Sequence, residues 1–305
     1  MYNTVCSSKE NFTHVYTNNT PNYTKCKFCI IGGVKTDEQE HGMLLAFDIG
    51  NSSISFGVAN IVGDYPQFIA KSRIASSPHR TPDEYVVLIR EILRLSDITY
   101  EQIDSLAVSS VVPQLTNAIS EAASHFSKAK PLIVGPGIRT GLNIRVDSQT
   151  QVGADIVANA VAALCHTSAP AVIVDMGTAT TISVVDTSST LIGTIICPGL
   201  QVSLNALSFA ASLISGSDFT RPAQIIGKNT HDSVNSGVIN GHANMIDGFA
   251  RDIRQMLIGT TDTKLSLLAT GGLAEYVIPY CRNKFALVPD LTLYGVAEIY
   301  RRNQK

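Results

Sequence analysis

The same short design occurs twice in this sequence, and this repetition limits the possible folds more than any other feature. In each copy an apolar run ends in Asp, which is followed by one further residue, a Gly and a series of small hydroxyl or amide side chains. The first copy contains Asp48 and Gly50, and the second contains Asp175 and Gly177. We interpret the repetition as an internal duplication in which each copy begins with a strand, a tight turn and a second strand.

Further strands are indicated by short apolar runs that are bounded by turn residues. In the first copy we expect strands at 44–47 and 53–59, then a buried strand at 105–112 that Pro113 stops, and another at 131–134. In the second copy we expect strands at 171–174, 180–185, 191–196 and 265–269.

Two helices are indicated between these strands. Thr81, Pro82 and Glu84 form a capping box at the start of the first, whose buried stripe is expected to consist of Val86, Ile89 and Leu93. The second helix is expected over residues 155–164. Alternating strands and helices of this kind predict an α/β protein.

The domain organisation follows from the same patterns. Residues 1–42 are rich in Asn, Thr, Lys and Tyr and are predicted to be an appended, poorly ordered tail. We interpret Cys26 and Cys29, a C-x-x-C pair in this tail, as two ordinary thiols, because no second pair at zinc-ligand spacing exists. Residues 43–150 are predicted to form the first half of the duplication and residues 151–305 the second half.

Composition argues against several classes of function. The formal net charge is −2, and Lys and Arg are not gathered on one predicted element, so nucleic acid is not an expected partner. Apolar runs are too short to cross a membrane. The six cysteines follow no regular spacing in a chain that is too large to need disulfide staples. These features predict a soluble, cytoplasmic protein.

The duplicated design has the donors that a polyphosphate and its metal ion require. Gly lets backbone N–H groups approach phosphate oxygens, the hydroxyl side chains donate hydrogen bonds, and the Asp carboxylate can hold the cation. A single Asp-x-Gly is explained equally well by turn formation, but two copies predict a pair of facing turns that clamp a polyphosphate. A third element, in which Gly271 and Gly272 end an apolar strand, would let an adenine ring lie against the backbone.

From Met43 to about Asn303 the sequence resembles the type III pantothenate kinases, a family of the actin, hexokinase and heat-shock ATPase superfamily. The resemblance implies a duplicated ribonuclease H-like or actin-like ATPase fold, with two similar α/β halves around a nucleotide cleft. The matching motifs are the opening D-x-G-N-S at 48–52, G-A-D at 153–155 with N-A at 159–160, D-x-G-T-A-T-T at 175–181, P-G at 198–199, I-G-x-N-T at 226–230 and A-T-G-G-L at 269–273.

The resemblance also implies an activity. It predicts a homodimeric enzyme that uses ATP with Mg²⁺ and a monovalent cation, K⁺ or NH₄⁺, to phosphorylate pantothenate to 4′-phosphopantothenate, the first step of coenzyme A biosynthesis. Asp155 would be the proton acceptor, Asp175 would bind the monovalent cation, and Asp48 would serve Mg-ATP. The residues that would contact ATP are Asp48, Ile49, Gly50, Asn51, Ser52, Ser53, Ile54, Ser55 and Thr178, and those that would contact pantothenate are Gly153, Ala154, Asp155, Ile156 and Thr230.

One departure from the family pattern leaves alternatives open. Ile156 stands where the family has an Arg, which would form hydrogen bonds worth roughly 1.5–3 kcal/mol to the substrate carboxylate. The nucleotide half of the site is therefore better preserved than the acceptor half. Besides a pantothenate kinase, the sequence is compatible with an ATP-binding regulatory protein without catalysis, or with a kinase of an uncharged acceptor. Asp155 itself, at the first turn of a predicted helix, could be a structural cap.

Overall fold

The computed structural model describes residues 42–61, 65–148, 151–210, 219–259 and 262–304. The expected N-terminal tail, except for residue 42, lies outside the described residues, and so do Cys26 and Cys29. The described part of the chain belongs to one compact unit.

The first sheet contains five strands in the order β3-β2-β1-β4-β5. Strands β1, β2 and β3 form an antiparallel meander, and β4 and β5 extend it with parallel pairings on the other side of β1. The strands are β1 (Met43–Ile49), β2 (Ser53–Asn60), β3 (Gln67–Ala75), β4 (Ile103–Ser110) and β5 (Leu132–Ile133).

The second sheet repeats this arrangement. Its order is β11-β10-β7-β8-β9-β6, in which β7, β8 and β9 are antiparallel and β10 and β11 follow β7 in parallel. The internal duplication predicted from the sequence is therefore confirmed. Strand β6 precedes residue 150 but pairs with β9 in the second sheet. The strands are β6 (Asn143–Ile144), β7 (Ala171–Met176), β8 (Ala179–Val185), β9 (Thr190–Pro198), β10 (Ser266–Thr270) and β11 (Ala286–Leu287).

Helices α1 (Pro82–Leu95) and α2 (Pro113–Ala123) pack on the first sheet through one apolar cluster. The capping box of α1 is confirmed, since Thr81 and Glu84 exchange side-chain and backbone hydrogen bonds. The predicted buried stripe is wrong at one position, because Tyr85 is fully buried whereas Val86 is only partly buried. Pro113 does not stop the strand, which ends at Ser110; it begins α2, where a missing N–H costs nothing.

One face of the second sheet is covered by α4 (Leu200–Ala210), α5 (Thr230–Ile258) and α6 (Ala274–Val277), which share an apolar cluster with β7, β8 and β10. Short 3₁₀ helices lie at Tyr100–Gln102 and at Ile278–Tyr280. Among the described residues, no helix combines the length and the apolar character needed to span a bilayer.

Helix α3 (Ala154–His166) touches both sheets, which explains its composition. Val157 and Val161 pack into a cluster with β1 and β4, whereas Ala160 and Ala163 pack into a cluster with β7 and β8. All residues from 156 to 163 are buried. A helix that is apolar on every side is expected only where protein surrounds it.

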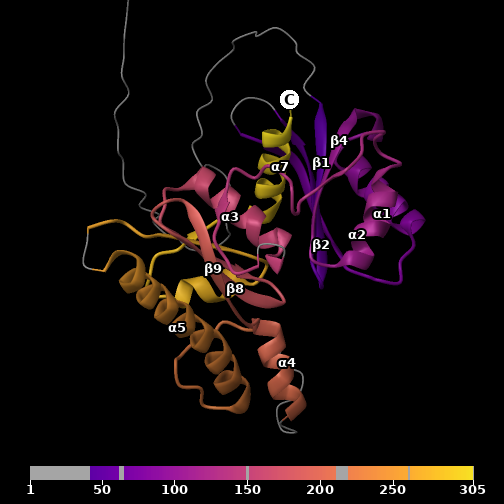
Figure 1. The fold of residues 1–305 in the computed structure, drawn as a ribbon. Helices are drawn as coiled ribbons and strands as arrows, with labels where there is room; N and C mark the ends of the chain where they lie inside the picture. Colours follow the sequence, from indigo (N-terminus) through magenta and orange to yellow (C-terminus); the bar gives the residue numbers. More distant parts are fainter. Residues whose placement is uncertain (1–41, 62–64, 149–150, 211–218, 260–261, 305) are drawn as a thin grey trace, which may run out of the picture. The chain divides into compact units, whose positions relative to one another are not determined.

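Helix α7 (Leu291–Asn303) lies beside α3 and β1 (Figure 1). The two helices approach so closely that a Cβ atom on Gly295 would collide with the carbonyl oxygen of Ala158. Glycine is therefore required at this crossing. As a result α7, the last described helix, shares one core with α3 and with β1, the first strand.

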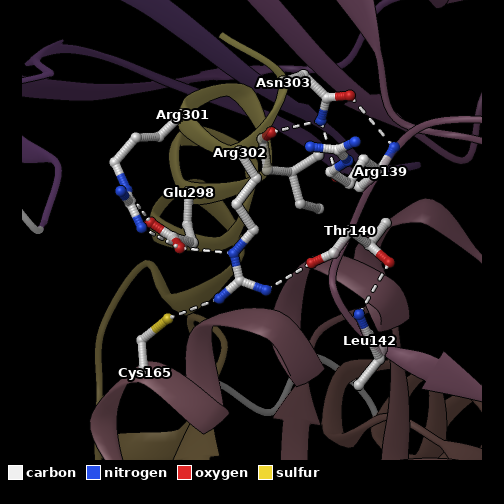
Figure 2. Close-up of polar contacts among 9 residues, drawn as sticks. Arg139, Thr140, Leu142, Cys165, Glu298, Arg301, Arg302 and Asn303 are labelled. Carbon is white, nitrogen blue, oxygen red and sulfur yellow. Dashed lines mark hydrogen bonds and ion pairs between the residues drawn. The ribbon is translucent and has the colours of Figure 1, made fainter. Parts of the chain in front are cut away.

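The C-terminal end of α7 is held by a network of charged side chains (Figure 2). Glu298, whose side chain is only 4% exposed, pairs with Arg301 at 2.7 Å and with Arg302 at 2.6 Å. Arg302 also donates to the carbonyl oxygen of Thr140 at 2.6 Å, and Asn303 exchanges hydrogen bonds with the backbone of Arg139. We call these contacts the α7 clasp, because they tie the helix to the segment before β6.

Candidate active site

The two duplicated turns meet in the structure. Each follows the first strand of its half, and in each the Gly N–H donates to a backbone carbonyl across the turn, Gly50 to Ser53 and Gly177 to Ala179, both at 3.0 Å. At the exposed tips of the turns, the hydroxyls of Ser52 and Thr178 lie 2.7 Å apart, within hydrogen-bonding distance. Hydroxyl groups from separate halves of the chain therefore face one another.

Asp48 and Asp175 stand at equivalent positions beside these turns. Each keeps partial exposure, whereas the residues directly before and after it in its strand are buried. Burial raises the pKa of Asp48 to about 8, and the negative charges of Asp175 and Asp155 add to this effect. Burial likewise raises the pKa of Asp175 to about 6, against the effect of a hydrogen bond from Asn159. A cation would relieve the cost of ionising both carboxylates.

The raised pKa of Asp48 predicts a pH-dependent stability of the ligand-free protein. Between about pH 4 and pH 8 the folded state binds more protons at Asp48 than the unfolded state does, so this group lowers stability as the pH rises. At pH 8, Asp48→Asn is expected to raise the free energy of unfolding by about 1–3 kcal/mol, because it removes a buried charge without a partner ion. Urea unfolding at pH 5 and pH 8, without Mg²⁺ or K⁺, measures the effect. The exposed Asp147→Asn is the control, and an equal gain at both pH values would contradict the account.

Asp175 is held by a chain of hydrogen bonds that begins on α7. Asn159 donates from Nδ2 to Asp175 Oδ2 at 2.8 Å, and Thr292 donates to Asn159 Oδ1 at 3.0 Å. Asn159 and Thr292 are buried, so both bonds are shielded from water. The carboxylate of Asp175 therefore has a defined orientation before any ion binds.

Asp155 is the second residue of α3, after Gly153 at the N-cap. Its Oδ1 accepts a hydrogen bond from the backbone N–H of Ile156 at 2.8 Å. Burial raises the pKa of Asp155, and bonds from backbone amides oppose this shift. The carboxylate therefore satisfies a free amide of the helix end, and its negative charge also acts on both Asp48 and Asp175. Asp155 therefore caps α3 and also lies close enough to Asp48 and Asp175 to act on them.

The third predicted element lies against the second turn. Gly271 has φ of +91°, and a Cβ there would lie 2.5 Å from the backbone nitrogen of Met176. Leu273 donates from its backbone to the Met176 carbonyl at 3.3 Å. The strand that ends in the Gly pair thus runs next to the strand that carries Asp175.

Ile156 and Thr230 are in different surroundings from the three carboxylates. Ile156 is 8% exposed and packs in the core between α3 and the second sheet. Thr230 begins α5 and lines an open groove of about 600 Å³ together with Leu207, Gly227 and Ser233. The charges of Asp48, Asp155 and Asp175 act on one another, and the turns beside Asp48 and Asp175 meet at Ser52 and Thr178. None of the contacts described here connects Thr230 to this group.

Three further residues near this site were given no role from the sequence. Asn159 and Thr292 orient Asp175, and Arg73 on β3 has a positive charge that lowers the pKa of both Asp48 and Asp175. Asn159 belongs to the N-A motif that matches the family, and it lies one helical turn after Asp155, which places the two side chains on the same side of α3, but neither feature gave it a role. Arg73 and Thr292 gave no signal, because strand pairing and helix packing bring them to the site.

The carboxylates of the site are oxygen donors, the ligand type that Mg²⁺ prefers. Among the described residues, no three His, Cys, Asp or Glu side chains form a ready metal site. This agrees with the chemistry of Mg²⁺, which commonly takes only one or two carboxylates and completes its shell with phosphate oxygens and water. Asp48 fits such a role, and Asp175 offers an oriented oxygen ligand to a monovalent cation.

Comparison with known proteins identifies the family. The sequence model of the type III pantothenate kinases matches residues 44–252. The chain belongs to this family. A type III pantothenate kinase of Citrifermentans bemidjiense is 36% identical over 262 residues, which are 86% of this chain and 100% of that protein.

Solved structures of more distant proteins show that the fold of this family member is that of the actin-like ATPases. A Campylobacter jejuni protein described as a Baf family transcriptional activator is 19% identical, with a TM-score of 0.52 over 85% of this chain and 98% of that chain. The activator of 2-hydroxyisocaproyl-CoA dehydratase from Clostridium difficile, solved with bound ADPNP, is 11% identical, with a TM-score of 0.50 over 85% of this chain and 94% of that chain. The predicted fold class is confirmed.

Proposed function

We propose that this kinase transfers the γ-phosphoryl group of ATP to the primary hydroxyl of pantothenate, giving 4′-phosphopantothenate and ADP. The observation that carries the proposal is the contact between the two duplicated turns, with Asp48 and Asp175 beside them, in a member of the type III pantothenate kinase family. This arrangement supplies backbone amides, hydroxyls and carboxylates from both halves to one polyphosphate.

In the proposed reaction, a bond forms between the pantothenate hydroxyl oxygen and the γ-phosphorus, while the bond from the γ-phosphorus to the bridging oxygen of ADP breaks. Asp155 accepts the hydroxyl proton. Ser52 and Thr178 donate to phosphate oxygens, together with the backbone of residues 48–55. Mg²⁺ bound with ATP would neutralise phosphate charge. Gly153, Ala154, Ile156 and Thr230 remain proposed pantothenate contacts.

The direct test is a coupled assay of ADP release with pantothenate, Mg²⁺ and K⁺. We expect turnover that requires all three, and its absence at millimolar pantothenate would refute the proposed function. A non-catalytic ATP-binding protein would bind ATP in calorimetry without heat from pantothenate. The relatives bear the name of an enzyme, and this favours catalysis over that alternative. A kinase of an uncharged acceptor would prefer an amide analogue such as pantetheine.

We further propose that the two duplicated carboxylates serve different ions, Asp48 the Mg²⁺ of Mg-ATP and Asp175 a monovalent cation, K⁺ or NH₄⁺. Asp48→Asn is expected to weaken Mg-ATP binding, whereas Asp175→Asn is expected chiefly to reduce activation by K⁺. The support is that Asp175 is oriented by Asn159 within the core, while Asp48 stands beside the turn of residues 50–53. Titration of activity with K⁺ at saturating ATP measures the difference. Identical K⁺ responses of the wild type and Asp175→Asn would exclude Asp175 as the ligand.

A homodimer and a cytoplasmic location complete the proposal. Apolar side chains on α4 support self-association, since Phe209 is 94% exposed and Val202 and Leu207 are also exposed. The described cysteines, Cys165, Cys197 and Cys281, are free thiols, as expected in a reducing compartment. Light scattering of the purified protein tests the dimer directly.

A further inference from the structure

Arg73 lies in line with Asp48 across the strands of the first sheet. Strand pairing sets Asp48 opposite Ser55 and Ser55 opposite Arg73, across β1, β2 and β3. Residues directly opposite one another in antiparallel strands project from the same face of the sheet, and two strand spacings amount to about 10 Å. A side chain as long as arginine can extend over most of that distance.

The contacts of Arg73 show that its side chain extends toward the site. Its Nε donates to Ser55 Oγ at 3.1 Å, and Ser55 is the last residue of the proposed ATP-binding stretch. A Cβ on Gly272 would lie 2.7 Å from Arg73 Nη1, so the guanidinium also reaches the Gly pair of the second half. The side chain is nevertheless 48% exposed, and a bound ligand could reach it.

An ion pair with Asp290 does not account for this position. Arg73 Nη2 is 3.8 Å from Asp290 Oδ1, beyond hydrogen-bonding distance, whereas Lys71 contacts Asp290 Oδ2 at 2.6 Å. Lys71 is thus the closer partner of Asp290. The guanidinium of Arg73 keeps donors for another anion.

The duplication indicates that the fold itself does not require a cation here. In the second half, strand pairing sets Asp175 opposite Thr181 and Thr181 opposite Ile196. Ile196, the counterpart of Arg73, is 66% exposed. The same edge position of the repeated sheet therefore accepts a neutral residue. A functional need in the first half explains the arginine better than a structural one.

The negative charge of the site indicates why a cation such as Arg73 is needed there. ATP brings negative charge to a place that already holds Asp48, Asp155 and Asp175. The charge of Arg73 acts on Asp48 and Asp175, the two carboxylates beside the phosphate turns. An arginine fork matches the geometry of phosphate oxygens and binds them with paired charge-assisted hydrogen bonds.

We propose that Arg73 is a further phosphate-binding residue of this kinase, which contacts the polyphosphate of ATP from the edge of the first sheet. The inference rests on the proposed function for the identity of the nucleotide. It assigns Arg73 to ATP and not to the carboxylate of pantothenate, because the side chain is hydrogen-bonded to Ser55 and lies close to Gly272.

Calorimetry with Mg-ATP and with adenosine, in the absence of pantothenate, tests the proposal. Arg73→Gln is expected to weaken Mg-ATP binding roughly tenfold to a hundredfold and to leave adenosine binding unchanged within twofold. Arg73→Lys, which keeps the charge but loses the fork, should fall between wild type and Arg73→Gln. Lys71→Gln is the matched control, since it removes a cation from the same strand and from Asp290 but not from Ser55, and its Mg-ATP affinity should stay within twofold of wild type.

Steady-state kinetics separates the substrates. For Arg73→Gln the KM for ATP should rise and the KM for pantothenate should stay within twofold. Unchanged Mg-ATP affinity, an equal loss of adenosine binding, or a rise confined to the KM for pantothenate would each overturn the proposal. If wild type bound ATP but transferred nothing to pantothenate, the proposed function would fail, and calorimetry would still decide the role of Arg73.

Discussion

Replacing Asp155 by Asn is expected to lower turnover by roughly 10²–10⁴ while the free energy of unfolding changes by less than about 1 kcal/mol. The amide oxygen of Asn can still accept the hydrogen bond that Ile156 donates to Asp155, so the end of α3 keeps its satisfied amide. What the variant loses is the group that accepts the hydroxyl proton. Pantothenate-dependent ADP release and urea unfolding, measured on one preparation, separate the two effects.

The matched control for this experiment is Asp83→Asn. Asp83 is also the second residue of a helix, α1, but it is exposed and lies outside the site. Its replacement should leave turnover unchanged and should alter stability by no more than the Asp155 change does. If Asp155→Asn retained full turnover in a protein that phosphorylates pantothenate, Asp155 would be a cap only and the proposed mechanism would be wrong.

Replacing Glu298 by Ala is expected to lower the free energy of unfolding by about 3–5 kcal/mol. The carboxylate of Glu298 is buried and accepts from both Arg301 and Arg302, which are partly buried themselves. Burial alone would raise the pKa of Glu298, but the hydrogen bonds and charges of the two arginines outweigh it and lower the pKa. Removing the carboxylate leaves two guanidinium groups at the α7 clasp without this counter-charge.

Glu91→Ala provides the comparison, because Glu91 forms an ion pair with Arg94 on the exposed face of α1. Surface pairs of this kind contribute about 0–1 kcal/mol. Since the folded-state pKa of Glu298 is lowered, its contribution should be complete above the ordinary carboxyl pKa and should disappear as the pH falls through the folded value. A loss of less than about 1 kcal/mol for Glu298→Ala at pH 7 would show that the clasp does not hold α7.

Local patterns explain why the duplicated fold was predictable. The strand, turn and strand of each half are contiguous in sequence, and the apolar runs that end at Asp48 and Asp175 mark both strand ends. The capping box at Thr81 is equally local. Tyr85 was missed because an aromatic ring with a polar tip is not marked as buried by periodicity alone.

The remaining features of the site depend on contacts between distant segments. Arg73 reaches the site through strand register, and Thr292 reaches Asn159 because α7 packs on α3. Neither pairing leaves a trace in neighbouring residues. Ile156 stays a proposed pantothenate contact, and it also packs in the core of a helix that touches both sheets, a position that periodicity does not reveal.

The place of α7 has a consequence for the synthesis of the protein. The first strand and α7 share one core, and Thr292 on α7 completes the support of Asp175, yet β1 leaves the ribosome among the first described elements and α7 leaves it last. At about 5–20 residues per second, β1 waits on the order of 10–50 s for its final packing partner. During that interval the apolar face formed by Leu44 and Ala46 lacks its packing partners on α7, and the nascent chain cannot complete the support of Asp175. Activity should therefore appear only after α7 has left the ribosome, and chaperones should engage the first half of the chain before then.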